Sequence, residues 1–94
     1  METEVLKELD FKKIQDNLWI YIGDLYIITC SSIKYGALRE ELVEMIAFFR
    51  ESELVFSYVF GVNDKSNYKY GFNVLLNKAN KHIGEIIAKQ IADI

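Results

Sequence analysis

The sequence contains no proline, one cysteine and one histidine, and these absences exclude several kinds of site. A single cysteine, Cys30, cannot form an intramolecular disulfide or a multi-cysteine zinc site. With His82 as the only histidine, any metal site would depend on carboxylate ligands. Hydrophobic residues make up 51% of the 94-residue chain, which therefore has the apolar area that disordered and low-complexity chains lack. We expect one folded domain spanning residues 1–94.

Long hydrophobic runs and an excess of basic charge are also missing. The longest apolar stretch, residues 54–62, is strand-sized and far below the roughly 20 residues that span a bilayer. The N-terminus lacks the basic start and apolar core of a signal peptide. A net charge of −3 argues against duplex nucleic acid as a partner, because such binding depends on clustered Lys and Arg. We expect a cytoplasmic protein that binds neither membrane nor duplex nucleic acid.

The clearest local pattern is a β-hairpin centred on Gly23 and Asp24. Strand-forming runs flank these residues, and glycine suits the first position of a type II′ turn, so we predict a two-residue loop with Ile22 facing Leu25. Successive side chains of a strand alternate between its faces, which gives the hairpin two apolar faces. One is an aliphatic face: Leu18, Ile20, Ile22, Leu25 and Ile27. The other is an aromatic face: Trp19, Tyr21, Tyr26, Ile28 and Cys30.

The remaining patterns complete a small α+β domain. Apolar residues at helical spacing predict helices over residues 3–15, 38–50 and 77–91. Alternation predicts a second hairpin, with strands over residues 54–62 and 68–76. The expected order is α-ββ-α-ββ-α, with a single antiparallel sheet of about four strands and helices packed on it. In element order alone this resembles roadblock and longin-type domains, whose sheets often join across a dimer, so the resemblance implies a homodimer.

No known catalytic motif occurs in the sequence. It has no glycine-rich phosphate loop, paired-cysteine or paired-histidine spacing, or glycine-flanked nucleophilic serine. His82 falls between lysines on the predicted outer side of the last helix, where we expect it to be solvated. We expect Cys30 to serve packing or an interface, since a reactive thiol needs a nearby cation or helix N-terminus to lower its pKa. The sequence therefore predicts no enzyme activity, no cofactor and no metal.

The aromatic face is the main candidate for function. Trp19, Tyr21 and Tyr26 are costly to expose together, and Trp and Tyr are enriched at protein interfaces. Three explanations stay open: the N-terminal helix covers these rings, a protein covers them, or they line a small-ligand pocket. We favour a non-catalytic protein-binding module, such as a small acidic inhibitor or antitoxin-like protein of microbial or phage origin. Glu40, Glu41 and Glu44 add negative charge that steers a basic partner toward the rings. The predicted interface comprises Trp19, Tyr21, Tyr26, Ile28, Glu40, Glu41 and Glu44.

The alternative is a sensor or sponge for a nucleotide or metabolite. Its site would combine the aromatic face with a face of small residues, forming a cleft at a dimer seam. The small residues are Ser57, Gly61, Gly71 and Asn73. A ligand at 100 times its Kd adds about 2.7 kcal/mol to stability, so a thermal-shift screen separates this alternative from the first.

Overall fold

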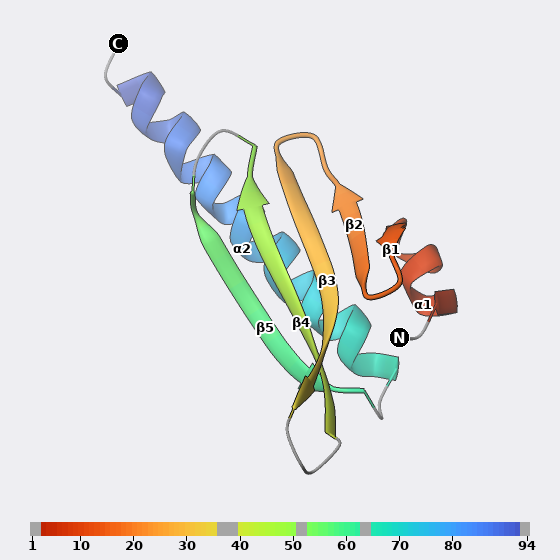
Figure 1. The fold of residues 1–94 in the computed structure, drawn as a ribbon. Coiled ribbons are helices and arrows are strands. Elements are labelled where there is room, and N and C mark those ends of the chain that lie inside the picture. Colours follow the sequence, from red (N-terminus) through yellow and green to blue (C-terminus); the bar gives the residue numbers. More distant parts are fainter. Residues whose placement is uncertain (1–2, 36–39, 51–52, 63–64, 93–94) are drawn as a thin grey trace.

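The computed structural model describes residues 3–35, 40–50, 53–62 and 65–92, which form two helices and five strands (Figure 1). Each strand pairs antiparallel with the next, giving one sheet in the order β1-β2-β3-β4-β5. The predicted α+β class and single antiparallel sheet are confirmed. The elements are α1 (Thr3–Glu8), β1 (Lys12–Gln15), β2 (Leu18–Ile22), β3 (Tyr26–Tyr35), β4 (Glu40–Phe49), β5 (Val55–Gly61) and α2 (Lys65–Ala92).

Two segments differ in type from the prediction, and the first is residues 38–50. The sequence predicts a helix there, but the chain forms β4 over Glu40–Phe49. Val43, Met45 and Ala47 are buried on one side of this strand, while Leu42, Ile46 and Phe48 occupy the other side. Because both faces are apolar, the period of two is hidden and apolar residues also recur at helical spacing.

The second segment is residues 68–76, for which the sequence predicts a strand but which lies within α2. The buried residues of this helix are spaced three and four apart, as one helical face requires: Tyr68, Gly71, Phe72, Leu75 and Ala79. The alternating aromatic residues that suggest a strand are divided by the helix, with Tyr68 fully buried and Tyr70 60% exposed. A run of five strands followed by one long helix replaces the predicted hairpin–helix–hairpin order, so the resemblance in element order does not hold.

The first hairpin is confirmed, but its register differs by two residues. Ile22 pairs with Ile27 rather than Leu25, and the Gly23 N–H donates to the Tyr26 carbonyl at 2.8 Å. A shift of two residues leaves every side chain on its own face. The predicted separation of the aliphatic face from the aromatic face therefore survives the longer loop.

The N-terminal helix is shorter than predicted because a C-terminal cap ends it. The Phe11 N–H donates to the Leu6 carbonyl at 2.9 Å, and the Asp10 N–H donates to the Lys7 carbonyl at 3.0 Å. Asp10 has a φ of 64°, so these bonds form a Schellman motif with Asp10 in the left-handed position. The chain then enters β1, an unpredicted strand at the edge of the sheet.

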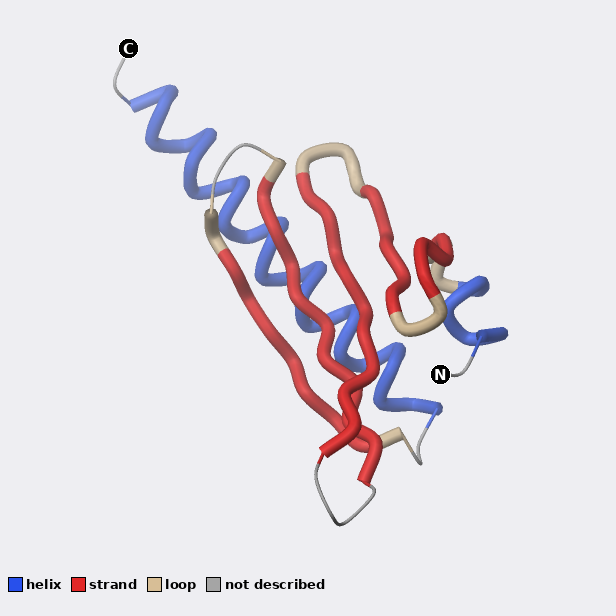
Figure 2. Tube along the Cα trace, in the orientation of Figure 1, coloured by secondary structure: helices blue, strands red, loops and turns tan. Residues whose placement is uncertain are grey.

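The core lies between α2 and one face of the sheet. Phe60 of β5 packs edge-on against Tyr68, with ring centroids 4.9 Å apart, and Tyr21 of β2 packs against Phe72 at 5.0 Å. Figures 1 and 2 show α2 running behind the strands and projecting past the end of the sheet. Ile86 and Ile91 are consequently 40% and 66% exposed. No helix in the described ranges is long and apolar enough to cross a membrane.

Candidate functional site: an open sheet face

The predicted aromatic anchors lie in the core. Trp19 is 3% exposed and Tyr26 is 9% exposed, and Ile28 is completely buried beside them. Tyr21 is half-buried, with its ring between Phe72 and Tyr26, whose ring centroid is 6.3 Å away. The expectation that these rings are available to a partner does not hold for the monomer, because residues of the N-terminal segment and of α2, among them Phe11 and Phe72, pack against Tyr21 and share its core cluster.

The three predicted steering glutamates do not form one acidic surface. All belong to β4, where neighbouring residues point to opposite faces. Glu44 pairs with Ser31 and shares a face with Ile46, whereas Glu41 lies on the opposite face with Val43. The Glu40 side chain lies outside the described part of the structure. A continuous acidic strip along a helix was expected only because this segment was predicted to be helical.

The four residues of the predicted ligand cleft are also dispersed. Ser57 and Gly61 are exposed on β5, on the sheet face opposite α2. Gly71 is buried in α2, where an added Cβ atom would lie 2.6 Å from Cδ1 of Tyr58. Asn73 is exposed on α2. The small residue at position 71 therefore serves close helix–sheet packing, and these residues do not line a common cavity.

The most reactive side-chain types are held in apolar packing. Cys30 is completely buried, and this burial raises the pKa of its thiol to about 12. The His82 ring packs against Phe49 and Phe56, with centroid distances of 4.9 and 6.4 Å, so it is half-buried rather than fully solvated as predicted. Within the described ranges, no three metal-ligating side chains come together.

Burial of Cys30 predicts slow thiol labelling and a specific pH dependence. At pH 8 the native protein should react with a thiol reagent far more slowly than the unfolded chain, because the thiolate is the reactive form.

In the unfolded chain the thiol ionises near its ordinary pKa of 9.0, while the folded thiol keeps its proton until about pH 12. Its contribution to stability is therefore complete below pH 9 and declines between pH 9 and 12. Urea unfolding of wild type and Cys30→Ala across this range measures the difference, and parallel pH curves would contradict it.

Ten apolar side chains of the described part of the sheet lie on the face opposite α2, and no described helix covers this face (Figure 1). We call this surface the open face. Its pairing aligns four apolar residues straight across the sheet, since Ile22 pairs with Ile27, Ile27 with Phe48, and Phe48 with Val55. Its apolar members are Leu18, Ile20, Ile22, Ile27, Ile33, Leu42, Ile46, Phe48, Val55 and Val59.

The open face exposes several large apolar side chains to solvent. Ile22 is 56% exposed, and Val55 and Val59 are each 50% exposed. Four strands about 4.8 Å apart and eight residues of about 3.4 Å each give a projected area of about 500 Å². An antiparallel sheet with one solvated face normally alternates apolar and polar residues, and contiguous apolar patches of this size usually mark interaction sites. The choice of the aromatic face as the predicted interface implies that the aliphatic half of this surface lies in the core, and the structure shows the reverse.

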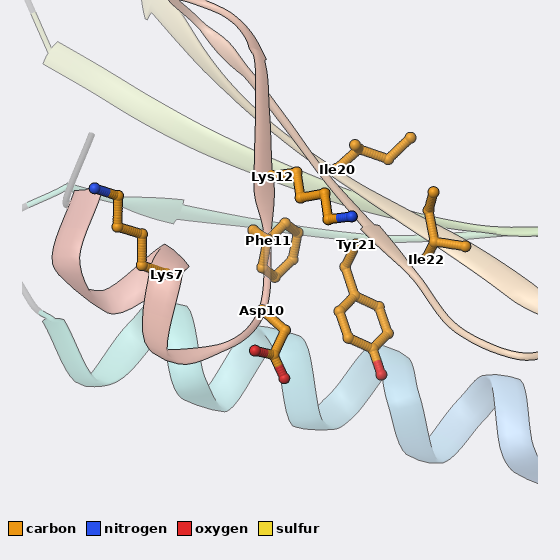
Figure 3. A pocket seen from close by; sticks show the side chains of 7 residues that line it. All are labelled: Lys7, Asp10, Phe11, Lys12, Ile20, Tyr21 and Ile22. Atoms are coloured by element: carbon orange, nitrogen blue, oxygen red, sulfur yellow. The ribbon is translucent and has the colours of Figure 1, made fainter.

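A hollow of about 510 Å³ adjoins the open face at the β2 edge (Figure 3). It forms because β1 pairs with β2 only as far as Lys12 and Ile20, so Tyr21 and Ile22 pair with β3 alone. In Figure 3, Ile20 and Ile22 point away from α2 while Tyr21 points toward it. The lining residues are Lys7, Asp10, Phe11, Lys12, Ile20, Tyr21 and Ile22.

No protein-family model matches the chain, and no curated protein or solved structure is significantly similar to it. Its function is therefore inferred from its own residues. A solvated sheet face normally carries polar side chains, and the open face carries many apolar ones. The aromatic face and the Cys30 thiol are buried, and Glu41 and Glu44 lie on opposite faces of the sheet. The open face is therefore the candidate functional site.

Proposed function

We propose that this protein is a non-catalytic protein-binding module that binds through its open face. The observation that carries the proposal is the uncovered apolar row from Ile22 to Val55 across four strands. Burial of apolar surface is favourable by about 25 cal/mol per Å², and a partner that covers Ile22, Val55 and Val59 removes such surface from water. Association itself costs about 4–15 kcal/mol, so binding requires a partner surface that fits the open face closely.

The placement of the reactive side chains also favours binding over catalysis. The Cys30 thiol is buried and its pKa is raised, which is the opposite of what an active nucleophile needs. His82 stacks against Phe49 on the α2 side of the sheet, away from the open face. The narrower expectation of an inhibitor or antitoxin-like protein stays a prediction, because no described feature identifies such a target.

A pair of matched substitutions tests the proposal. Ile22 on the open face and Ile91 on α2 are both highly exposed, at 56% and 66%, so Ile22→Lys and Ile91→Lys should both fold normally. Immobilised wild type and I91K should retain a polypeptide from a host lysate, identified by mass spectrometry, and I22K should retain at least tenfold less. The retained polypeptide can be another protein or the chain itself.

The proposal fails if no retained polypeptide distinguishes I22K from wild type. Equal loss in I91K and I22K would also contradict it, because non-specific hydrophobic adsorption would then explain the retention. Far-UV circular dichroism and the Tm of each variant confirm that the comparison is made between folded proteins.

A further inference from the structure

We infer that the open face binds a second copy of this chain, face to face, about a two-fold axis that runs parallel to the strands between β2 and β3. The inference rests on the proposed function and specifies its partner. Such an axis exchanges β2 with β3 and β1 with β4 between the copies. Ile22 of one copy then lies over Ile27 of the second copy, and the symmetry repeats this contact.

Charge complementarity on the open face supports this arrangement. Of the strand side chains that the structure describes on this face, Glu44 is the one anion and Lys12, which pairs with Ile20, is the one cation. A partner that covers Glu44 must supply a positive group, since an unpaired buried charge is strongly unfavourable. The two-fold axis places Lys12 of one copy over β4 of the second copy. There it lies two residues, or about 7 Å, along the strand from Glu44. The two long side chains span that offset, and two such ion pairs form per dimer.

Shape supports the same axis. Exchange of β1 with β4 brings Phe48 of one copy over the edge of β2 in the other, where the hollow of about 510 Å³ lies beside Ile20 and Ile22. A cavity of about 150 Å³ is sufficient to hold a benzene ring, so the hollow has room for the phenyl group. The overlap comprises β1 to β4 of each copy and leaves β5, with Val55 and Val59, beyond the contact.

Charge reversal provides a sharp test. Wild type should sediment as a dimer whose Kd rises at least tenfold in Lys12→Glu and in Glu44→Lys, because each homodimer then contains two like-charge pairs. An equimolar mixture of K12E and E44K should recover dimers, since both contacts in the mixed dimer join opposite charges. Lys78→Glu on α2 is the control and should dimerise like wild type. Circular dichroism and the Tm confirm that each variant is folded.

Several outcomes would overturn the inference. They are a wild type that stays monomeric at millimolar concentration, a dimer unaffected by both charge reversals, and a mixture of K12E and E44K that does not recover. If wild type is monomeric but retains a different protein, and I22K does not retain that protein, the inference of a second copy fails while the proposed function stands. If neither association depends on the open face, both fail.

Discussion

Replacement of Trp19 by alanine is expected to destabilise the protein by about 3–5 kcal/mol, the usual cost of removing a buried aromatic side chain. Trp19 is 3% exposed and lies in a row with Cys30 and Met45, both completely buried under α2. Chains of this size typically have a total stability of about 5–14 kcal/mol, so the variant would lose a large share of it. Urea unfolding monitored by far-UV circular dichroism measures the change.

Ile22→Ala is the matched substitution on the opposite face of the same strand. Ile22 is 56% exposed, so its truncation should change the stability of the monomer by less than about 1 kcal/mol when measured at low protein concentration. Trp19 would instead be an external anchor, as the sequence pattern indicates, if W19A unfolded at the wild-type urea concentration and still lost its partner. A large loss of stability in W19A together with a small one in I22A shows that the aromatic face, and not the aliphatic face, forms the core.

Gly71→Ala and Gly84→Ala are expected to change stability in opposite directions. Both glycines lie within α2, where alanine is intrinsically better by about 1 kcal/mol. A Cβ atom at position 71 would lie 2.6 Å from Tyr58 Cδ1, whereas at position 84 nothing lies within 4 Å. Overpacking costs about 1–3 kcal/mol, which outweighs the gain at position 71 only. Thermal unfolding should therefore show a lower Tm for G71A and a higher Tm for G84A.

A double-mutant cycle identifies the cause of the G71A effect. If Tyr58 is responsible, adding G71A to a Tyr58→Ala background should be neutral or stabilising, because the obstructing ring is gone. Equal destabilisation by G71A in both backgrounds would show that contact with Tyr58 is not the reason. The cycle tests the helix–sheet packing independently of any binding partner.

Local sequence patterns predicted the secondary structure correctly where only one type of element satisfied them. The Gly23 turn between two strand-forming runs determined the first hairpin, and the spacing of Ala79 and Ile83 indicated the C-terminal helix. They failed for β4, where Val43, Met45 and Ala47 on one face and Leu42, Ile46 and Phe48 on the other left no polar alternation to reveal a strand. They also failed for residues 68–76, where alternating aromatic residues resembled a strand until their burial in α2 showed a helical period.

The sequence by itself determined which side chains of the first hairpin share a face: Trp19 with Tyr21 and Ile28, and Ile20 with Ile22 and Ile27. It did not determine which face becomes the core, because both faces are apolar and alternation carries no information about what packs on either of them. Only the tertiary structure decided this. α2 packs on the aromatic side of the sheet, where Gly71 permits close approach to Tyr58 and Phe72 packs edge-on against Tyr21. The aliphatic face is left open, and it is this surface that we propose binds a protein.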